Sequence, residues 1–293
     1  MQKIRKAVIP AAGYGTRFLP VTKTVPKEML PVLDKPLIHH IVQDLTDAGI
    51  EQVIFVVSSY KKAIEDYFGR FFELEYQLEK NGKTEALRIM KEPEGMAEFV
   101  FVRQPEMNGN GGAILCAKNI IGDEPFIVSW ADDIIRAENS EPKQLVEAYK
   151  KYGTTILGGI RTTDPEDTNK YGYAGGEEIE DGIIKVSEFI EKPGPDNAPS
   201  DLAIVSSFVF NSDIFPALEK AQKEIGNNRE LVYVDGVNTL LKEGKDAHAI
   251  EVKGGKHYDT GNIMEFLKTN IEFALMRDEI KDEFKDYLKS LDI

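Results

Sequence analysis

Short apolar runs, rich in β-branched residues, recur through the first half of the chain. Five of them lie at residues 6–9, 52–58, 99–104, 125–132 and 154–160. Runs of this length that are apolar at consecutive positions are typical of strands buried on both faces of a parallel sheet. The pattern therefore predicts five strands.

Segments with helical periodicity separate these runs. They lie at residues 36–49, 61–68, 72–92, 112–120 and 142–153. Pro36 suits the first turn of its helix and Gly49 suits the stop. Strands that alternate with helices favour βαβ crossovers, so we expect an α/β fold with three layers, Rossmann-like, whose central sheet is mainly parallel.

The pattern changes after about residue 165. Residues 170–196 indicate hairpins, with turns at Gly175-Gly176 and Asp181-Gly182. A strand at 202–210, a helix at 213–224 begun by Ser212 or Asp213, and one or two helices at 261–291 follow.

No polar linker and no repeat divides the chain, so we expect one domain over residues 1–293. Its expected parts are residues 1 to about 165, residues from about 166 to 262, and C-terminal helices at about 263–293.

Charge and cysteine content narrow the possible partners. The net charge of −14 argues against a general affinity for nucleic acid or an anionic membrane. No run approaches the roughly 18 apolar residues of a membrane span, and the N-terminal apolar stretch is too short for a signal peptide. The one cysteine, Cys116, is typical of a small core residue and permits no internal disulfide, so we expect a reducing, cytoplasmic location.

The loop after the first predicted strand, "PAAGYGTRFLPVTKTVPKEMLP" at residues 10–31, holds the most informative chemistry. Phe18 stands where a dinucleotide fingerprint needs its third glycine, and no Gly-Lys-Ser/Thr follows as a P-loop requires. Thr16 and Arg17 add a hydroxyl and a permanent cation to the backbone that the glycines expose, which suits a polyphosphate. Lys27 supplies a second cation in a proline-restricted segment.

This loop resembles that of the nucleotidyltransferases that make nucleoside-diphosphate sugars, in particular the bacterial enzymes that act on UTP and glucose 1-phosphate. The likeness continues through "YKKAIEDYF", "VRQ", "GGAILCAK", "DEPF", "KYG", "EKP", "APSDLAIV" and "YDTGN", and covers most of residues 5–275. It implies uridylyl transfer from UTP to glucose 1-phosphate, which forms UDP-glucose and pyrophosphate. The sugar phosphate is already ionised, so the transfer needs alignment and charge neutralisation rather than a general base.

The resemblance implies that residues 1 to about 165 are the nucleotide-binding part and that residues from about 166 to 262 are the sugar-phosphate-binding part. It also implies roles for single residues. The implied catalytic residues are Arg17, Lys27, Asp132 and Lys192. The implied substrate-binding residues are Ala11, Ala12, Gly13, Gly15, Thr16, Glu28, Gln104, Gly109, Gly172, Glu191 and Val205. Asp132 and Asp259 are the implied Mg²⁺ ligands, with phosphate oxygens completing the shell.

Two alternatives stay open for the carboxylates. Asp133 could equally be the metal ligand, and Asp259 could instead cap the helix that follows it.

The likeness is incomplete in three places. Residues 109–112 read Gly-Asn-Gly-Gly where the subgroup has Gly-Leu-Gly-His, and "SSFVF" at 206–210 replaces a stretch that normally contains Gly-Arg-Tyr. "NNRELVYVD" at 227–235 replaces Gly-Gly-Glu-Ile-Gln-Leu-Thr-Asp. These changes affect the expected sugar and subunit surfaces more than the phosphate loop.

Other functions therefore stay open. One is a nucleotidyltransferase of the same fold that uses dTTP, CTP or another sugar 1-phosphate. The other is a non-catalytic nucleotide-sugar-binding regulatory protein. The resemblance also implies a homodimer or homotetramer.

Overall fold

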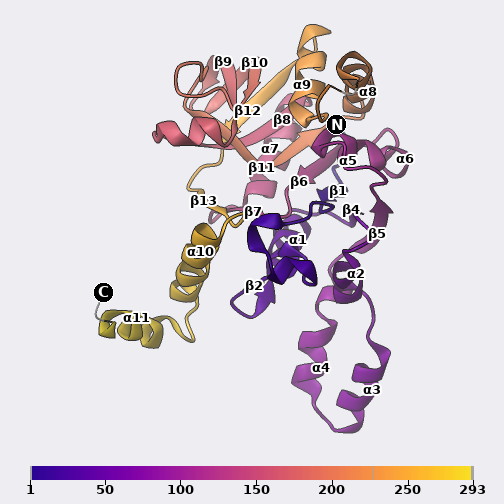
Figure 1. Ribbon diagram of the computed structural model, residues 1–293, viewed down its shortest axis with the longest axis vertical. Helices are drawn as coiled ribbons and strands as arrows, with labels where there is room; N and C mark the ends of the chain where they lie inside the picture. Colours follow the sequence, from indigo (N-terminus) through magenta and orange to yellow (C-terminus); the bar gives the residue numbers. More distant parts are fainter. Residues whose placement is uncertain (1, 227, 292–293) are drawn as a thin grey trace.

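A nine-stranded sheet, in the order β5-β4-β1-β6-β11-β8-β12-β10-β9, organises the molecule (Figure 1). The computed structural model describes residues 2–226 and 228–291. The five strands predicted in the first half are all present: β1 (Lys6–Pro10), β4 (Gln52–Val57), β5 (Glu98–Arg103), β6 (Phe126–Ser129) and β8 (Thr155–Arg161). The remaining strands of the sheet are β9 (Gly172–Glu180), β10 (Ile183–Glu191), β11 (Leu202–Phe210) and β12 (Ala247–Glu251).

The sheet is mixed, which corrects the prediction of a mainly parallel one. β5, β4, β1 and β6 run parallel to one another, and β8 is parallel to β12. β11 is antiparallel to β6, β8 and β9, and β10 is antiparallel to β12 and β9. Periodicity could not reveal this, because a strand buried on both faces reads as the same apolar run in either direction.

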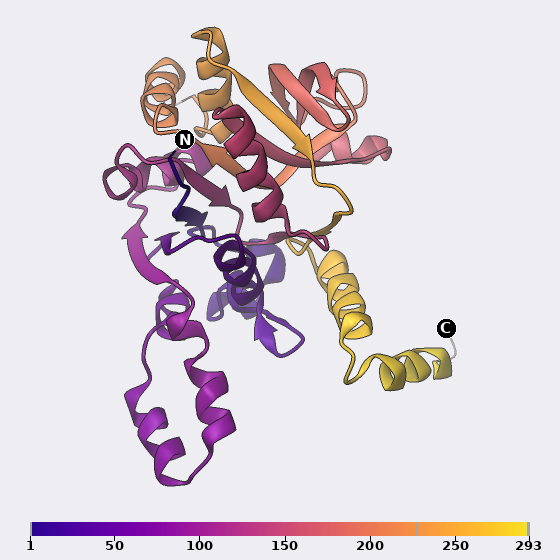
Figure 2. The same cartoon turned by 180° about the vertical axis from the view of Figure 1, so that it is seen from behind.

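Helices cover both faces of the sheet. One face carries α5 (Asn110–Cys116), α6 (Lys118–Ile121), α8 (Ile214–Ile225) and α9 (Tyr233–Lys242). The other carries α1 (Leu37–Asp47), α2 (Lys62–Phe68), α7 (Glu141–Tyr152) and α10 (Ile263–Met276); α7 lies across the side turned toward the viewer in Figure 2. In β1, Val8 belongs to the first core, and Ala7 and Ile9 belong to the second, so the strand is buried on both faces as its sequence predicts.

Three local predictions change. The predicted helix at 112–120 is two helices, α5 and α6, which meet at Ala117. The predicted helix at 72–92 is two helices, α3 (Phe72–Lys80) and α4 (Thr84–Lys91), because Gly82 adopts φ 64° between them. Asp181-Gly182 does form a hairpin turn between β9 and β10, but the turn predicted at Gly175-Gly176 is wrong. Both glycines lie inside β9, where a Cβ on Gly176 would approach the Lys185 carbonyl oxygen to 2.0 Å.

Smaller elements complete the fold. β7 (Asp133–Arg136) pairs with β13 (Lys256–Asp259), β2 (Pro31–Val32) pairs with β3 (Lys35–Pro36), and α11 (Lys281–Ser290) ends the described chain. Short 3₁₀ turns lie at Thr16–Phe18, Val21–Lys23, Lys27–Met29, Pro93–Gly95 and Pro165–Asn169. Asp213 is the residue that begins α8, without a side-chain capping bond. None of the helices within the described ranges is long and apolar enough to cross a membrane.

Candidate active site

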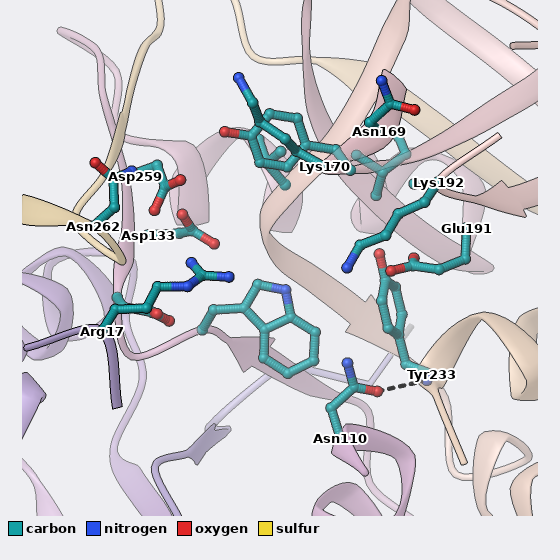
Figure 3. A pocket seen from close by; sticks show the side chains of 16 residues that line it. Arg17, Asn110, Asp133, Asn169, Lys170, Glu191, Lys192, Tyr233, Asp259 and Asn262 are labelled. Atoms are coloured by element: carbon teal, nitrogen blue, oxygen red, sulfur yellow. Dashed lines mark hydrogen bonds between the residues drawn. The ribbon is translucent and has the colours of Figure 1, made fainter. Parts of the chain in front are cut away.

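A cleft of about 440 Å³ lies where the β1 loop, the β7–β13 pair and the ends of β10 and β11 meet (Figure 3). Its lining combines segments far apart in the sequence. It consists of Arg17, Asn110, Trp130, Asp132, Asp133, Asn169, Lys170, Tyr171, Gly172, Glu191, Lys192, Ile204, Val205, Tyr233, Asp259 and Asn262. Besides Gly172 and Val205, six residues with predicted roles in catalysis or in substrate or metal binding line it: Arg17, Asp132, Asp133, Glu191, Lys192 and Asp259. Charged groups from both halves of the chain therefore face one cavity.

The glycine loop supports the first wall. Gly15 adopts φ 65° and begins the 3₁₀ turn Thr16–Phe18. A Cβ on Gly15 would lie 3.3 Å from Cβ of Lys27, so glycine is needed both for the backbone conformation and for this close approach. Thr16 faces a second hollow of about 400 Å³ beside the loop.

The other predicted loop residues differ in what they offer a ligand. The Ala11 amide already donates to the Val56 carbonyl at 2.8 Å, so this N–H is engaged by β4. Ala12 is buried, whereas nothing lies within 4 Å of a Cβ placed on Gly13. Open space for an approaching ligand is therefore found at Gly13 rather than at the alanines.

Arg17, Lys27 and Asp132 come together on this wall. Nζ of Lys27 forms an ion pair with Oδ2 of Asp132, and Nη1 of Arg17 donates to the Gly261 carbonyl at 3.4 Å. Burial works to lower the pKa of Lys27, but the carboxylates of Asp132 and Glu28 outweigh it and the pKa is raised. Lys27 is therefore a cation at neutral pH; it does not itself line the cleft but is paired with Asp132, which does.

Pairing of β7 with β13 brings Asp132 and Asp259 into one corner. Both the backbone N–H and the hydroxyl of Thr260 donate to the Asp132 carbonyl, at 3.0 and 2.7 Å. A Cβ on Gly261 would lie 2.9 Å from Oδ1 of Asp259, 3.3 Å from Oδ2 of Asp132 and 3.4 Å from Nη1 of Arg17. Any larger residue at position 261 would crowd both carboxylates and the guanidinium.

The structure bears on both alternatives for the carboxylates. Asn262, not Asp259, caps α10, because its side chain accepts from the Glu265 amide at 3.0 Å. Asp133 lines the cleft, but its Oδ1 is bonded to Nε2 of His257 at 3.1 Å. Burial raises the pKa of Asp133, and His257 opposes that rise. Of the two carboxylates, Asp132 therefore lies beside the Lys27 cation, whereas Asp133 is hydrogen-bonded to the buried imidazole of His257.

Glu28 lies beneath the loop rather than on the wall of the cleft. Its side chain is fully buried, and Oε2 is 2.7 Å from Nζ of Lys61, which is itself 4% exposed. Burial raises the pKa of Glu28, and Lys61 and Lys27 oppose the rise. Contact of Glu28 with a substrate stays a prediction; in the structure it braces the loop.

Gln104 and Gly109 lie next to each other at the end of β5. Nε2 of Gln104 donates to Oδ1 of Asn108 at 3.1 Å and to the Gly109 carbonyl at 3.2 Å. Gly109 adopts φ 99°, and a Cβ there would lie 2.2 Å from the Leu231 carbonyl oxygen. Position 109 therefore needs glycine, because the backbone of the segment before α9 passes too close for a side chain.

The opposite wall comes from β9, β10 and β11. In Figure 3, Lys192 points into the cleft from this side, and Arg17 points into it from the other. Lys192 adopts φ 50°, and its amide donates to the Tyr171 carbonyl at 3.1 Å. Burial raises the pKa of Glu191, and Lys192 opposes the rise. Gly172 lies against Glu191, whose Oε2 would be 3.1 Å from a Cβ at that position.

Sequence reasoning missed half of the lining. The missed residues are Asn110, Trp130, Asn169, Lys170, Tyr171, Ile204, Tyr233 and Asn262. Trp130, Tyr171 and Asn262 stand inside or beside "SWADD", "KYG" and "YDTGN", so those motifs could have indicated them. Tyr233 has no such signal: its amide donates to Oδ1 of Asn110 at 2.8 Å, across 123 residues of sequence.

Comparison with known proteins identifies the family of the chain. The model of a family described as nucleotidyl transferase matches residues 6–274.

The chain belongs to the nucleotidyl transferase family.

Its relatives within this family include a UTP–glucose-1-phosphate uridylyltransferase of Bacillus subtilis (strain 168), which is 42% identical over 291 residues, 99% of this chain and 98% of the relative. Among solved structures, a UDP-glucose pyrophosphorylase in complex with UDP-glucose is 37% identical with a TM-score of 0.82, over 94% of this chain and 100% of that one. A UTP-bound UGPase from Acinetobacter baumannii is 31% identical with a TM-score of 0.89, over 98% and 99%. The α/β nucleotidyltransferase fold expected from the loop motif is confirmed.

Proposed function

We propose that this nucleotidyl transferase moves a uridylyl group from UTP to glucose 1-phosphate and so forms UDP-glucose and pyrophosphate. The observation that supports it best is one cleft in which Arg17, Asp132 and Asp259 face Glu191 and Lys192. After their proposed ligands we call the first side the nucleotide wall and the second side the sugar wall. Similar proteins are named for this reaction, and similar structures were solved with UTP or UDP-glucose bound.

The reaction is an in-line displacement at the α-phosphorus of UTP. A phosphate oxygen of glucose 1-phosphate forms the new P–O bond while the bond to the β-phosphate breaks, and pyrophosphate leaves with the electron pair. Arg17 and Lys27 neutralise the triphosphate and the departing pyrophosphate, and Lys192 holds the incoming phosphate from the other wall. The nucleophile is already ionised, so the residues contribute alignment and charge.

We assign Mg²⁺ to Asp132 and Asp259. Within residues 2–226 and 228–291 no group of three or more metal-ligating side chains occurs. Two carboxylates fit this metal, because Mg²⁺ commonly takes one or two carboxylates and completes its shell with water and substrate phosphates. Both carboxylates border Gly261, which leaves the corner between them free of a side chain. When bound, the metal supplies further neutralisation of phosphate charge.

Gln104 is our candidate for reading the base. Its amide nitrogen is engaged by Asn108 and Gly109, so its amide oxygen is the group left to a ligand. An oxygen acceptor suits the N3–H donor of uracil or thymine, whereas N3 of cytosine is an acceptor. This favours UTP or dTTP over CTP.

Pyrophosphate release with Mg²⁺ and a matrix of nucleoside triphosphates and sugar 1-phosphates tests the proposal. We expect release with UTP and glucose 1-phosphate above every other pair. A preference for dTTP or galactose 1-phosphate would change only the substrates named in the proposal and would leave nucleotidyl transfer as the reaction. Binding of nucleotide sugars without release for any pair would instead favour the regulatory protein.

We further propose that the chain assembles as a homodimer or homotetramer in the cytoplasm and acts as one domain. Both views show the α3–α4 arm and the α10–α11 helices as separate projections from the body (Figures 1 and 2). Both carry exposed apolar side chains, namely Phe71, Phe72, Leu74, Tyr76 and Ile89 on or beside the first and Ile263, Met264, Leu267, Ile271, Met276 and Tyr287 on the second. Light scattering that gives a monomer mass at micromolar concentration would contradict the assembly.

A further inference from the structure

A fully buried carboxyl group lies behind the cleft, outside the site described above. Glu141, the first residue of α7, is 2% exposed. Its Oε1 accepts from the Ser207 amide at 3.0 Å, and its Oε2 accepts from the hydroxyls of Ser206 and Ser207 at 2.7 and 3.2 Å. Three bonds from two successive residues to one carboxyl group make a specific anchor for this part of β11.

The anchored segment is a bulge. Between β11 and β8 the register pairs Ile204 with Gly159 and Phe208 with Leu157, so three residues on β11 oppose one on β8. Ser206 in this bulge adopts φ 63°, a left-handed conformation that a serine rarely takes. Hydrogen bonding by Glu141 compensates for this strain.

The bulge touches both walls of the cleft. Val205, the first of its three residues, lines the cleft next to Ile204, which pairs with Gly172 of β9. On the other side, the Trp130 amide donates to the Ser206 carbonyl at 2.9 Å, and the Ser206 hydroxyl lies 3.3 Å from the Asp133 carbonyl. A shift of this segment would therefore move Val205 relative to the Trp130–Asp133 wall.

The surroundings favour a positioning role over a binding one. Ser129, Asp133, Glu141, Ser206 and Ser207 border a cavity of only about 10 Å³, at the lower limit for one water molecule. Burial raises the pKa of Glu141 to about 8, so at neutral pH it is mostly a neutral acid. In the neutral form one of the two serine bonds at Oε2 is reversed, with the carboxyl O–H as the donor. Reversal at Ser206 leaves the Ser206 hydroxyl free to donate to the Asp133 carbonyl.

We propose that Glu141 is a positioning residue that ties the Ser206–Ser207 bulge to α7 and thereby fixes Val205, and with it the fit of the sugar 1-phosphate, against the nucleotide wall. This inference rests on the proposed transfer reaction for its kinetic readout. The bond from the Ser207 amide gives a second readout that does not depend on activity.

The test compares Glu141→Ala with Glu141→Gln, an amide that can still accept from Ser207 and donate to a serine oxygen. In Glu141→Ala we expect the KM for glucose 1-phosphate to rise on the order of tenfold, because small displacements of a positioned reactant are costly. The KM for UTP should change less than about twofold, and discrimination against galactose 1-phosphate should fall. Glu141→Gln should restore all three quantities, and amide exchange in residues 202–210 should quicken only in the alanine variant.

Several outcomes would overturn the proposal. Unchanged kinetics for the sugar 1-phosphate in folded Glu141→Ala would do so, as would equal weakening for UTP and sugar. If Glu141→Ala does not fold, Ser207→Ala gives the same test, since it removes the hydroxyl bonds to Glu141 and Ser129 but keeps the backbone bond. A wild-type protein that releases no pyrophosphate would defeat the proposed function, while the exchange comparison would still decide whether Glu141 anchors the bulge.

Discussion

The two walls of the cleft are stabilised differently. The nucleotide wall is built on charge pairs: Lys27 with Asp132, which lines the cleft, and Lys61 with Glu28 beneath the loop. The sugar wall has no such pair at Lys192 among the described residues; behind it, a buried carboxyl group bonds serines. The difference indicates that the nucleotide wall is formed before substrate arrives, whereas the cation of the sugar wall is available to pair with an incoming phosphate.

Replacing Asp132, the carboxylate at the centre of the nucleotide wall, should lower activity more than any other change. Asp132→Asn would lose a proposed metal ligand and the partner of Lys27 together. We expect turnover to fall about 1000-fold or more, and the Mg²⁺ concentration for half-maximal activity to rise. Steady-state pyrophosphate release at several Mg²⁺ concentrations measures both. Asp246→Asn, at an exposed ion pair with Lys185, is the control that should behave as wild type.

Breaking the Lys61–Glu28 ion pair beneath the loop should lower the free energy of unfolding and not only the activity. Lys61→Met would leave Glu28 buried without its partner, which costs about 3–5 kcal/mol of unfolding free energy. Urea denaturation measures this loss. The double variant Lys61→Met with Glu28→Gln should recover part of it, and an equal loss in both variants would show that the charge of Glu28 is not the cause.

The unpaired cation of the sugar wall should act in transfer and not in nucleotide binding. Lys192→Ala is expected to lower turnover about 100-fold, while the Kd for UTP measured by calorimetry changes less than about twofold. Lys170→Ala is the matched control, because Lys170 lines the same cleft but is paired with Asp167 at 3.0 Å. Equal loss of UTP binding in Lys192→Ala would place Lys192 with the nucleotide instead.

The smallest expected effect is a pH dependence of stability. The folded pKa of Glu141 is about 8, above its ordinary value, so the unfolded chain loses this proton first. Stability is therefore highest below the unfolded pKa and falls as pH rises toward 8. Between pH 6.5 and 8 the fall should be about 2 kcal/mol in wild type, and Glu141→Gln should lack it.

Asp44, Asp133 and His257 also face this region, but they are present in both proteins. The difference between the two stability curves therefore isolates Glu141. Parallel curves would mean that Glu141 is ionised in the folded protein across this range.

The comparison also shows where sequence reasoning succeeds. The nucleotide wall was predictable because Gly15, Arg17 and Lys27 stand within 13 residues and their order is informative by itself. The sugar wall was predictable only where a motif marked it, at Gly172, Glu191, Lys192 and Val205. Tyr233 and Asn110 were missed because their contact depends on packing between α9 and α5.

By itself, the sequence determined the first-half strands, the residue types of the phosphate loop and the family to which they belong. These features are local, since periodicity and turn chemistry act over a few residues. The tertiary structure alone decided the mixed direction of the sheet, the burial of Glu28 against Lys61, and the Glu141–Ser206–Ser207 network. Each of these depends on contacts between residues far apart in the sequence: Glu28 and Lys61 are 33 positions apart, and Glu141 is 65 and 66 positions from Ser206 and Ser207. A single sequence carries no local signal for such long-range contacts.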